Sequence, residues 1–198
     1  ANTNEGPKEQ FNSFGCSIST IPYLRAGMIE YGKEYQNIDK NWQKMAIYYC
    51  MIIPEGYGKI NRLYPFNDPY VTYKLTKNDK LQLSKGLNKL CQLLICAGGT
   101  ELYPSVYGGK KIRSTNDLKL LPSYIDSKNA NLMSVHLFSS CPMGEDTNVC
   151  VADSYGKVHG HEGLYLSDGS LLPSAPGVNP QGSILALANR NIEYLINK

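Results

Sequence analysis

The closing stretch of the chain decides how the rest of the sequence is interpreted. It contains the segments His136-Leu-Phe-Ser-Ser-Cys141-Pro-Met-Gly144, Gly163-Leu-Tyr-Leu-Ser-Asp168-Gly169-Ser-Leu-Leu-Pro173 and Gly177-Val-Asn179-Pro180-Gln181. A histidine and an asparagine stand here among turn residues and small side chains, and a helical pattern follows. Polar side chains on loops held by apolar segments are typical of binding and catalytic sites.

Each of these polar residues also has a purely structural explanation. An imidazole such as that of His136 exchanges a proton near neutral pH, but it can equally be a hydrogen-bonded structural group. Asn179 precedes Pro180, a residue suited to the first position of a helix, so Asn179 is a natural helix cap. The same helix start would also present free N–H groups to an anion or to a negative charge developing on a cofactor. From position alone, the capping explanation is favoured for Asn179.

Three other candidates are weaker. Asp168-Gly169 ends an apolar segment and is first of all a turn, although a glycine there would let a ligand approach the backbone closely. His159 and His161 flank Gly160 in a polar turn, and we expect both to be exposed. Cys141 has no neighbouring group that would activate a thiolate, so we do not expect it to be a nucleophile.

Composition and charge exclude several classes of protein. The chain has 198 residues, is 42% hydrophobic and carries a net charge of +3, with its lysines scattered. These values are typical of a folded globular protein and give no reason to expect a nucleic-acid partner. No apolar run is long enough to span a bilayer. Residues 1–10 do not resemble a signal peptide. Of the possible compartments, the cytoplasm is slightly favoured. The six cysteines lack the spacing of a metal site, and we expect free thiols.

The coarse pattern of the sequence predicts an α+β fold. Strands are expected over residues 45–53, 58–63, 70–75, 132–138 and 164–167, and short helices over 23–31 and after 180. The clearest element is a helix that begins after Thr76, which forms a capping pattern with Asp79, and ends at Gly98. Residues 1–20 are expected to be a loop, and residues 105–130 an exposed excursion that could serve as a pocket loop. Antiparallel pairing, in an antiparallel or mixed sheet with helices on one face, is the simplest arrangement.

The closing motifs together resemble the C-terminal part of the GMC (glucose–methanol–choline) oxidoreductases, which are flavoenzymes that oxidise alcohols with FAD. The resemblance is carried by residues 136–198 and is near-continuous there, with closing motifs closest to the cholesterol-oxidase branch. It is weaker upstream, where it is carried by Gly58 to Ile60, Asp68 to Asp79 and the helix to Gly98, and it is loose over residues 1–40. The matching residues are His136, Cys141, Met143-Gly144, Gly156 to Gly160, Gly163-Leu164, Asp168 to Ser170, Pro173, Asn179-Pro180 and Ala186 to Arg190.

The resemblance implies a role for each candidate residue. His136 would be the catalytic base for an alcohol, and Asn179 would hydrogen-bond the substrate oxygen while hydride passes to the flavin. The residues implied to contact FAD are Asp168, Gly169, Asn179, Pro180 and Gln181. No metal is implied.

The resemblance also implies that this chain is one portion of an enzyme. The G-x-G-x-x-G fingerprint of a dinucleotide-binding domain is absent from the sequence. Residues 1–135 would then be the substrate-binding domain, and residues 136–198 a strand, loop and helix that complete an FAD-binding Rossmann-like domain. The expected partners are a small alcohol and the N-terminal FAD-binding portion of the same enzyme, without which the chain would be inactive. The alternative is a truncated, non-catalytic paralogue that binds a ligand or partner; a GMC-type lyase that uses its flavin only structurally is a minor option.

Overall fold

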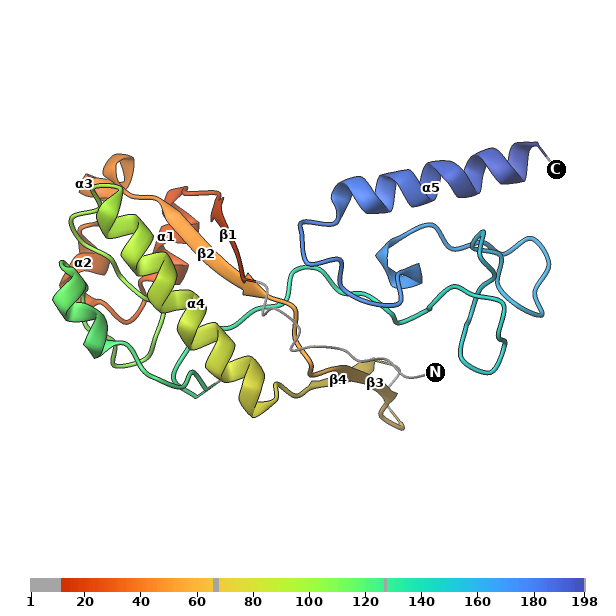
Figure 1. Cartoon of the computed structure of the whole chain (residues 1–198), viewed down its shortest axis with the longest axis horizontal. Helices are drawn as coiled ribbons and strands as arrows, with labels where there is room; N and C mark the ends of the chain where they lie inside the picture. The colour runs from red at the N-terminus through yellow and green to blue at the C-terminus, as the bar shows by residue number, and fades with distance from the viewer. Residues whose placement is uncertain (1–11, 66–67, 127, 198) are drawn as a thin grey trace, which may run out of the picture. The chain divides into compact units, whose positions relative to one another are not determined.

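The computed structural model describes residues 12–65, 68–126 and 128–197. The chain divides into two compact units, residues 1–132 and residues 133–198. The resemblance implied a division at residue 136, and the role of each part stays a prediction. Helices and short antiparallel strands occur together, so the α+β class is confirmed (Figure 1).

A two-stranded antiparallel ribbon lies at the centre of the first unit. Strand β1 (Asn12–Ser17) pairs with β2 (Ile47–Ile52), with Phe14 opposite Cys50. The strand expected at 45–53 is thereby confirmed, and the loop expected at 1–20 is wrong for residues 12–17; residues 1–11 lie outside the described residues. The segment Asn-Ser-Phe-Gly-Cys-Ser has weak local strand propensity, and its strand is stabilised by the distant partner β2.

A second ribbon forms the hairpin of β3 (Gly58–Arg62) and β4 (Pro69–Tyr73). Both strands were expected. Ile60 faces Val71 across the hairpin, yet both side chains are exposed. In the described part of the chain, the strands form two separate two-stranded sheets and not the single antiparallel or mixed sheet that the sequence predicted.

Helix α4 (Lys77–Cys96) is the longest element, and its predicted start is confirmed in detail. The hydroxyl of Thr76 accepts a hydrogen bond from the Asp79 backbone N–H, while the Asp79 carboxylate accepts one from the Thr76 N–H. This reciprocal pair satisfies two donors that the first turn leaves free. The helix packs against β1 and β2, and Gly98 follows its end with a φ of +94°.

Four short helical segments precede β2: α1 (Ile21–Gly27), α2 (Gly32–Gln36), α3 (Ile38–Asn41) and the 3₁₀ segment η1 (Trp42–Lys44). The helix expected over residues 23–31 is shorter than predicted, and Gly32 begins a helix instead of stopping one. Leu24, Met28, Tyr31 and Ile38 form a buried cluster among these segments. The α1 and α3 segments are therefore held by apolar packing, since helices this short are marginal alone.

Residues 105–130 were expected to be an exposed excursion, and this prediction is wrong. The stretch contains the 3₁₀ segment η2 (Thr115–Leu120), and four of its apolar side chains are buried: Val106, Ile112, Leu118 and Ile125. Ile112 and Leu118 join Cys91 of α4 in a second core cluster. Single apolar residues spaced among polar ones anchor this irregular segment without forming a periodic pattern.

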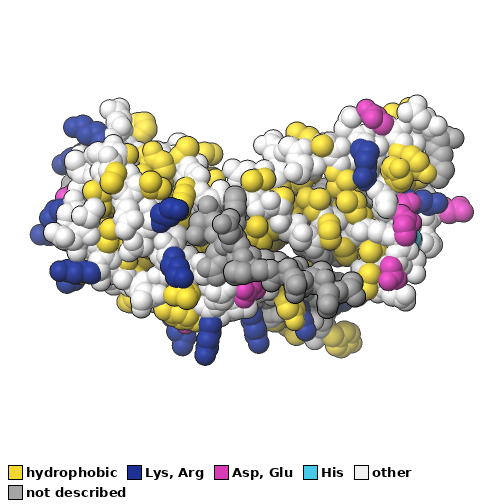
Figure 2. All heavy atoms as spheres, in the orientation of Figure 1, with side chains coloured by type: hydrophobic (Ala, Val, Ile, Leu, Met, Phe, Trp, Pro, Cys, Tyr) yellow, Lys and Arg dark blue, Asp and Glu magenta, His cyan; other side chains and the backbone are white. Residues whose placement is uncertain are grey.

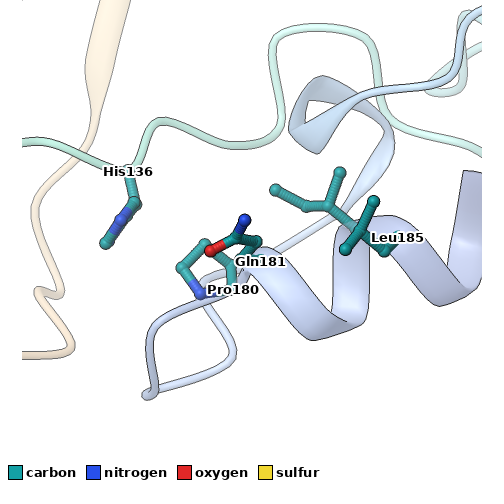
Figure 3. Close-up of a pocket in the computed structure, with 5 residues that line it drawn as sticks. His136, Pro180, Gln181 and Leu185 are labelled. Atoms are coloured by element: carbon teal, nitrogen blue, oxygen red, sulfur yellow. The ribbon is translucent and has the colours of Figure 1, made fainter.

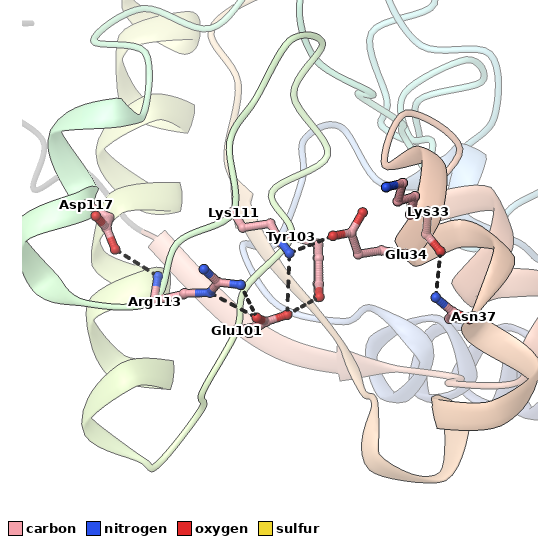
Figure 4. A network of polar contacts seen from close by, with 8 residues as sticks. All are labelled: Lys33, Glu34, Asn37, Glu101, Tyr103, Lys111, Arg113 and Asp117. Atoms are coloured by element: carbon pink, nitrogen blue, oxygen red, sulfur yellow. Dashed lines mark hydrogen bonds and ion pairs between the residues drawn. The ribbon is translucent and has the colours of Figure 1, made fainter.

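A polar network fastens the irregular segment to the N-terminal helices (Figure 4). Lys111 donates to Glu34 of α2 at 2.5 Å, and Arg113 donates to Glu101 at 2.6 Å. The hydroxyl of Tyr103 also donates to Glu101. Burial raises the pKa of the Tyr103 hydroxyl, and the adjacent Glu101 carboxylate adds to the effect.

The second unit has little regular secondary structure apart from helix α5 (Gln181–Ile196) and the 3₁₀ turn η3 (Gly169–Leu171). Its core cluster is formed by Ala152, Leu171 and Leu187. The strands expected at 132–138 and 164–167 are not formed; the latter stretch contains only an isolated bridge between Lys157 and Tyr165. Both stretches have strand-like sequences, but a strand also requires a partner for its backbone.

The basic side chains lie apart on the surface, as the scattered lysines of the sequence predict. Figure 2 shows Lys and Arg side chains at several separate places on the face that it presents. Among the described helices, none combines the length and the apolar character needed to cross a membrane.

Candidate active site

Helix α5 begins at the centre of the closing motifs. Pro180 is buried and stands as the N-cap, since its carbonyl oxygen accepts the first helical hydrogen bond from the Ile184 N–H at 2.8 Å. Gln181 is the first helical residue. The expectation that Pro180 is the first helical residue, with Asn179 as the cap, is therefore displaced by one position, because Pro180 has a ψ near 0° that differs from helical geometry.

His136 lies beside the start of this helix. An open pocket of about 300 Å³ is lined by His136, Pro180, Gln181, Ile184 and Leu185, and Figure 3 shows His136 on one side with the first turn of α5 on the other. The backbone bends at His136, whose side chain is exposed. The structure thus brings His136 together with Pro180 and Gln181, which lie far after it in the sequence.

Asn179 lies next to this pocket in sequence but is not among the residues that line it. Its side chain is exposed. Sequence interpretation did not identify Ile184 and Leu185, which give the pocket an apolar wall. The helical pattern after Pro180 held the signal, because residues three and four positions after the first helical residue lie one turn further along the same face.

Two backbone hydrogen bonds fix the segment that follows His136. The Cys141 N–H donates to the Ser170 carbonyl at 3.1 Å, and the Met143 N–H donates to the Leu171 carbonyl at 3.0 Å. Cys141 is half-buried. The Cys-Pro-Met-Gly motif therefore has a structural role that its sequence did not reveal: it joins the His136 segment to η3.

The Asp168-Gly169 turn is held from within. The Asp168 carboxylate accepts a hydrogen bond from the Ser170 backbone N–H at 2.7 Å, and hydrogen bonding to Ser170 lowers the pKa of that carboxyl. A Cβ at Gly169 would stand 3.2 Å from Ile184 Cδ1 and 3.4 Å from the Leu137 carbonyl oxygen. The absence of a side chain at Gly169 thus allows η3 to pack closely against α5 and the His136 segment.

The two remaining histidines differ from each other. His161 is exposed, as expected, but His159 is half-buried and its Nε2 lies 2.9 Å from the Gly144 carbonyl oxygen. The expectation of an exposed His159 is therefore wrong. Backbone hydrogen bonds fold the 141–166 region into successive turns, and His159 closes one of them.

A second polar cluster on α5 was not predicted. The guanidinium of Arg190 donates to the Ser154 carbonyl and to Asn191 Oδ1, and it lies 5.2 Å from the ring centroid of Tyr155. The Tyr155 and Tyr194 rings stack with centroids 3.7 Å apart. This cluster ties the C-terminal half of α5 to the turn at residues 153–156 and so holds the helix that lines the pocket.

The pocket fits one side of a flavin cofactor. The first-turn N–H groups of α5 lack intrahelical partners and carry the positive end of the helix dipole, while Ile184 offers an apolar surface to a planar ring. These are the donors and contacts that suit a ring gaining negative charge. Nothing in the sequence supplies a dinucleotide fingerprint for the rest of FAD, so the residues present match only part of that cofactor.

Comparisons with known proteins match the same family that the closing motifs resemble. A family model described as GMC oxidoreductase matches residues 54–188. An uncharacterised GMC-type oxidoreductase of Sinorhizobium fredii is 40% identical over 184 residues, covering 92% of this chain and 36% of the relative. A long-chain-alcohol oxidase of Arabidopsis thaliana is 27% identical over 194 residues, covering 89% of this chain and 24% of the relative. The chain therefore spans about a third or less of the length of these relatives.

Proposed function

The chain belongs to the GMC oxidoreductase family, and on that basis we propose that it is the C-terminal portion of an FAD-dependent enzyme that oxidises an alcohol group. The observation that carries this proposal is the position of His136 across an open pocket from the start of α5. A proton acceptor and a helix start suited to negative charge meet there. These are two groups that removal of a proton and a hydride from a CH–OH group requires.

His136 takes the proton of the substrate hydroxyl in this proposal. Its exposed imidazole faces the pocket, where an alcohol can approach it. Asn179, directly before Pro180, donates a hydrogen bond to the same substrate oxygen and so orients the carbon that loses the hydride. FAD, when bound, supplies the acceptor for that hydride.

The proposed cofactor contacts are Asp168, Gly169, Asn179, Pro180 and Gln181. The first-turn N–H groups at Gln181 would stabilise negative charge on the reduced ring. Asp168 and Gly169 hold η3 against α5, which positions the helix start relative to His136.

The remainder of the enzyme comes from polypeptide that the relatives have beyond this chain. We propose that residues 1–135 are the substrate-binding part and that residues 136–198 complete an FAD-binding domain formed mainly by the N-terminal portion of the enzyme. The proposed substrate is a small alcohol. The apolar wall of Ile184 and Leu185 beside His136 favours an alcohol with an apolar group next to its hydroxyl.

Anaerobic flavin reduction tests the proposal on the whole enzyme that contains this chain. A panel of primary and secondary alcohols is mixed with the flavin-loaded protein, and flavin absorbance is followed in time. His136→Ala should slow flavin reduction by roughly 10²–10⁴-fold with flavin still bound. His161→Ala is the matched control, because His161 is exposed outside the pocket.

Two outcomes would contradict the proposal. Reduction at an unchanged rate in His136→Ala would remove His136 from the chemistry. A whole protein that shows no flavin absorbance, even after addition of FAD, would favour the non-catalytic binding module instead.

A further inference from the structure

Residues 132–138, Leu-Met-Ser-Val-His-Leu-Phe, have the sequence of a strand but no strand partner. Alternate apolar side chains along the stretch are largely exposed: Met133 is 86%, Val135 71% and Leu137 68% accessible. His136 and Phe138 occupy the alternate positions of the stretch. The Phe138 side chain is half-buried near Gly169. Only Phe138 of the stretch is half-buried, and Met133, Val135 and Leu137 form an apolar set that the described part of this chain leaves open.

The backbone of the stretch is unpaired as well. Within the described part of the chain, no backbone–backbone hydrogen bond reaches residues 132–138. Figure 1 draws the stretch as a plain tube without a strand arrow. The stretch ends where the Cys141 N–H is fixed to the Ser170 carbonyl. An extended segment with free N–H and C=O groups and an apolar face is a site where another strand can add.

The occupant follows from the size of the relatives. The Sinorhizobium relative matches 92% of this chain with only 36% of its own length. Most of that relative is therefore polypeptide that has no counterpart in the 198 residues, and such polypeptide can supply a strand.

We propose that residues 132–138 pair, as a β-strand, with a strand of the larger portion of the enzyme that this chain lacks. The inference rests on the proposed function, because the partner strand belongs to the larger portion of the proposed enzyme. It adds the surface at which this chain and that portion meet. The contact would place His136 within a paired strand. Its position relative to the start of α5 would then be set by a ladder of backbone hydrogen bonds instead of by an exposed bend.

Hydrogen exchange measured by mass spectrometry tests the pairing. Two proteins are compared: the 198-residue chain alone, and a chimera that joins this chain to the remaining portion of the Sinorhizobium relative. In the chain alone, amides of residues 132–138 should exchange at nearly unprotected rates. In the chimera these amides should exchange at least roughly 100-fold more slowly than in the chain alone. The exchange of the exposed turn at residues 146–149 should change little.

Two variants of Val135 separate backbone pairing from side-chain burial. Val135→Pro removes the backbone donor and should abolish the protection of residues 132–138 in the chimera. Val135→Thr keeps both the donor and the branched shape, and it should retain the protection. Equal effects of the two substitutions would overturn backbone pairing.

Other results would also overturn the proposal. Fast exchange at residues 132–138 in a chimera whose α5 is protected would show that no strand adds there. Protection in the chain alone that grows with its concentration would assign the surface to a second copy of the chain. If the chimera does not fold, the intact Sinorhizobium relative gives the same measurement at the aligned residues, and fast exchange there again contradicts pairing.

Flavin reduction by alcohols, measured on the same chimera, keeps the two proposals separate. Protection at 132–138 without flavin reduction would sustain the pairing and contradict the proposed function. Flavin reduction without protection would contradict the pairing alone.

Discussion

The carboxylate of Asp79 accepts a hydrogen bond at 2.7 Å from the backbone N–H of Glu55, which lies 24 positions earlier in the chain. The same carboxylate accepts from the N–H groups of Gly56 and Thr76, and Asp79 is only 2% exposed. One buried carboxylate therefore caps α4 and also fixes the turn between β2 and β3. A residue that sequence pattern identifies as a local cap is a tertiary joint in the folded unit.

We predict that Asp79→Ala destabilises the first unit by about 3 kcal/mol, because it leaves several backbone donors without a charged acceptor. Urea unfolding followed by far-ultraviolet circular dichroism measures the change. Lys77→Ala, an exposed substitution in the same helical turn, should shift the midpoint little. Equal shifts for the two variants would mean that the Asp79 hydrogen bonds contribute nothing beyond helix propensity.

Local signals predicted α4, β2, β3 and β4 because each is specified by its own residues, such as the Thr76–Asp79 box. Strand β1 could not be predicted in this way: its residues acquire strand structure from the distant partner β2. The burial of Ile112 and Leu118 also escaped prediction, since neither belongs to a periodic pattern. Conversely, residues 132–138 have the sequence pattern of a strand, but no partner strand for them lies among the described residues.

The candidate site shows the same division. The resemblance implied roles for His136, Pro180 and Gln181; these three residues line one pocket, and their roles stay predictions. It could not show that Gly169 packs closely on Ile184, or that Arg190 holds the far end of α5. Those roles depend on distances between segments that no short motif encodes.

Gly169 and Gly182 provide a matched pair of substitutions in the second unit. Gly169→Ala should destabilise the packing of η3 on α5 by about 1–3 kcal/mol, because its Cβ would stand 3.2 Å from Ile184. A Cβ at Gly182 would meet nothing within 4 Å, so Gly182→Ala should be neutral or stabilising by up to about 1 kcal/mol. Exchange rates of α5 amides measure both. A Gly169→Ala variant as protected as the original chain would rule out the close packing.

The polar network of the first unit should make its stability depend on acid. A hydrogen bond from Lys111 lowers the pKa of Glu34, and bonds from Tyr103 and Arg113 lower the pKa of Glu101. The stability that these carboxylates contribute is therefore present above their unfolded pKa of 4.5 and is lost as the pH falls through the lower folded values.

Lys111→Met tests this sign. The variant should lower the melting temperature of the first unit at pH 7, and the gap to the original chain should narrow at pH 3, where the carboxylates are becoming protonated. Lys110→Met, a change at the exposed neighbouring residue, should show no such narrowing. A gap that stays constant from pH 7 to pH 3 would contradict the role of the network.

The cysteines should differ in reactivity according to burial. All six lie in the described residues and are free thiols; Cys16 and Cys96 are exposed, whereas Cys91 is buried. Burial raises the pKa of the Cys91 thiol to about 11, with a smaller contribution from Cys50. Iodoacetamide should alkylate Cys16 and Cys96 at least about 10-fold faster than Cys91, as peptide mass spectrometry can show. Equal rates in the folded chain, and not only in denaturant, would contradict the burial of Cys91.

The chain alone should bind FAD weakly. The cofactor contacts proposed for its pocket involve only one side of the flavin ring, and the sequence lacks the fingerprint that holds the diphosphate. Titration followed by flavin fluorescence should show no stoichiometric binding at micromolar concentrations of protein. Tight binding at a ratio of one to one would mean that the 198 residues hold the cofactor without the rest of the enzyme.

The position of the single tryptophan gives the first unit an optical signal that the second unit does not share. Trp42 lies in η1 of the first unit, and the second unit contains the stacked pair Tyr155 and Tyr194. Selective excitation of the indole therefore follows unfolding of the first unit alone, whereas hydrogen exchange of the α5 amides follows the second. Stability measurements on the whole chain can be resolved into two transitions without adding a label to either unit.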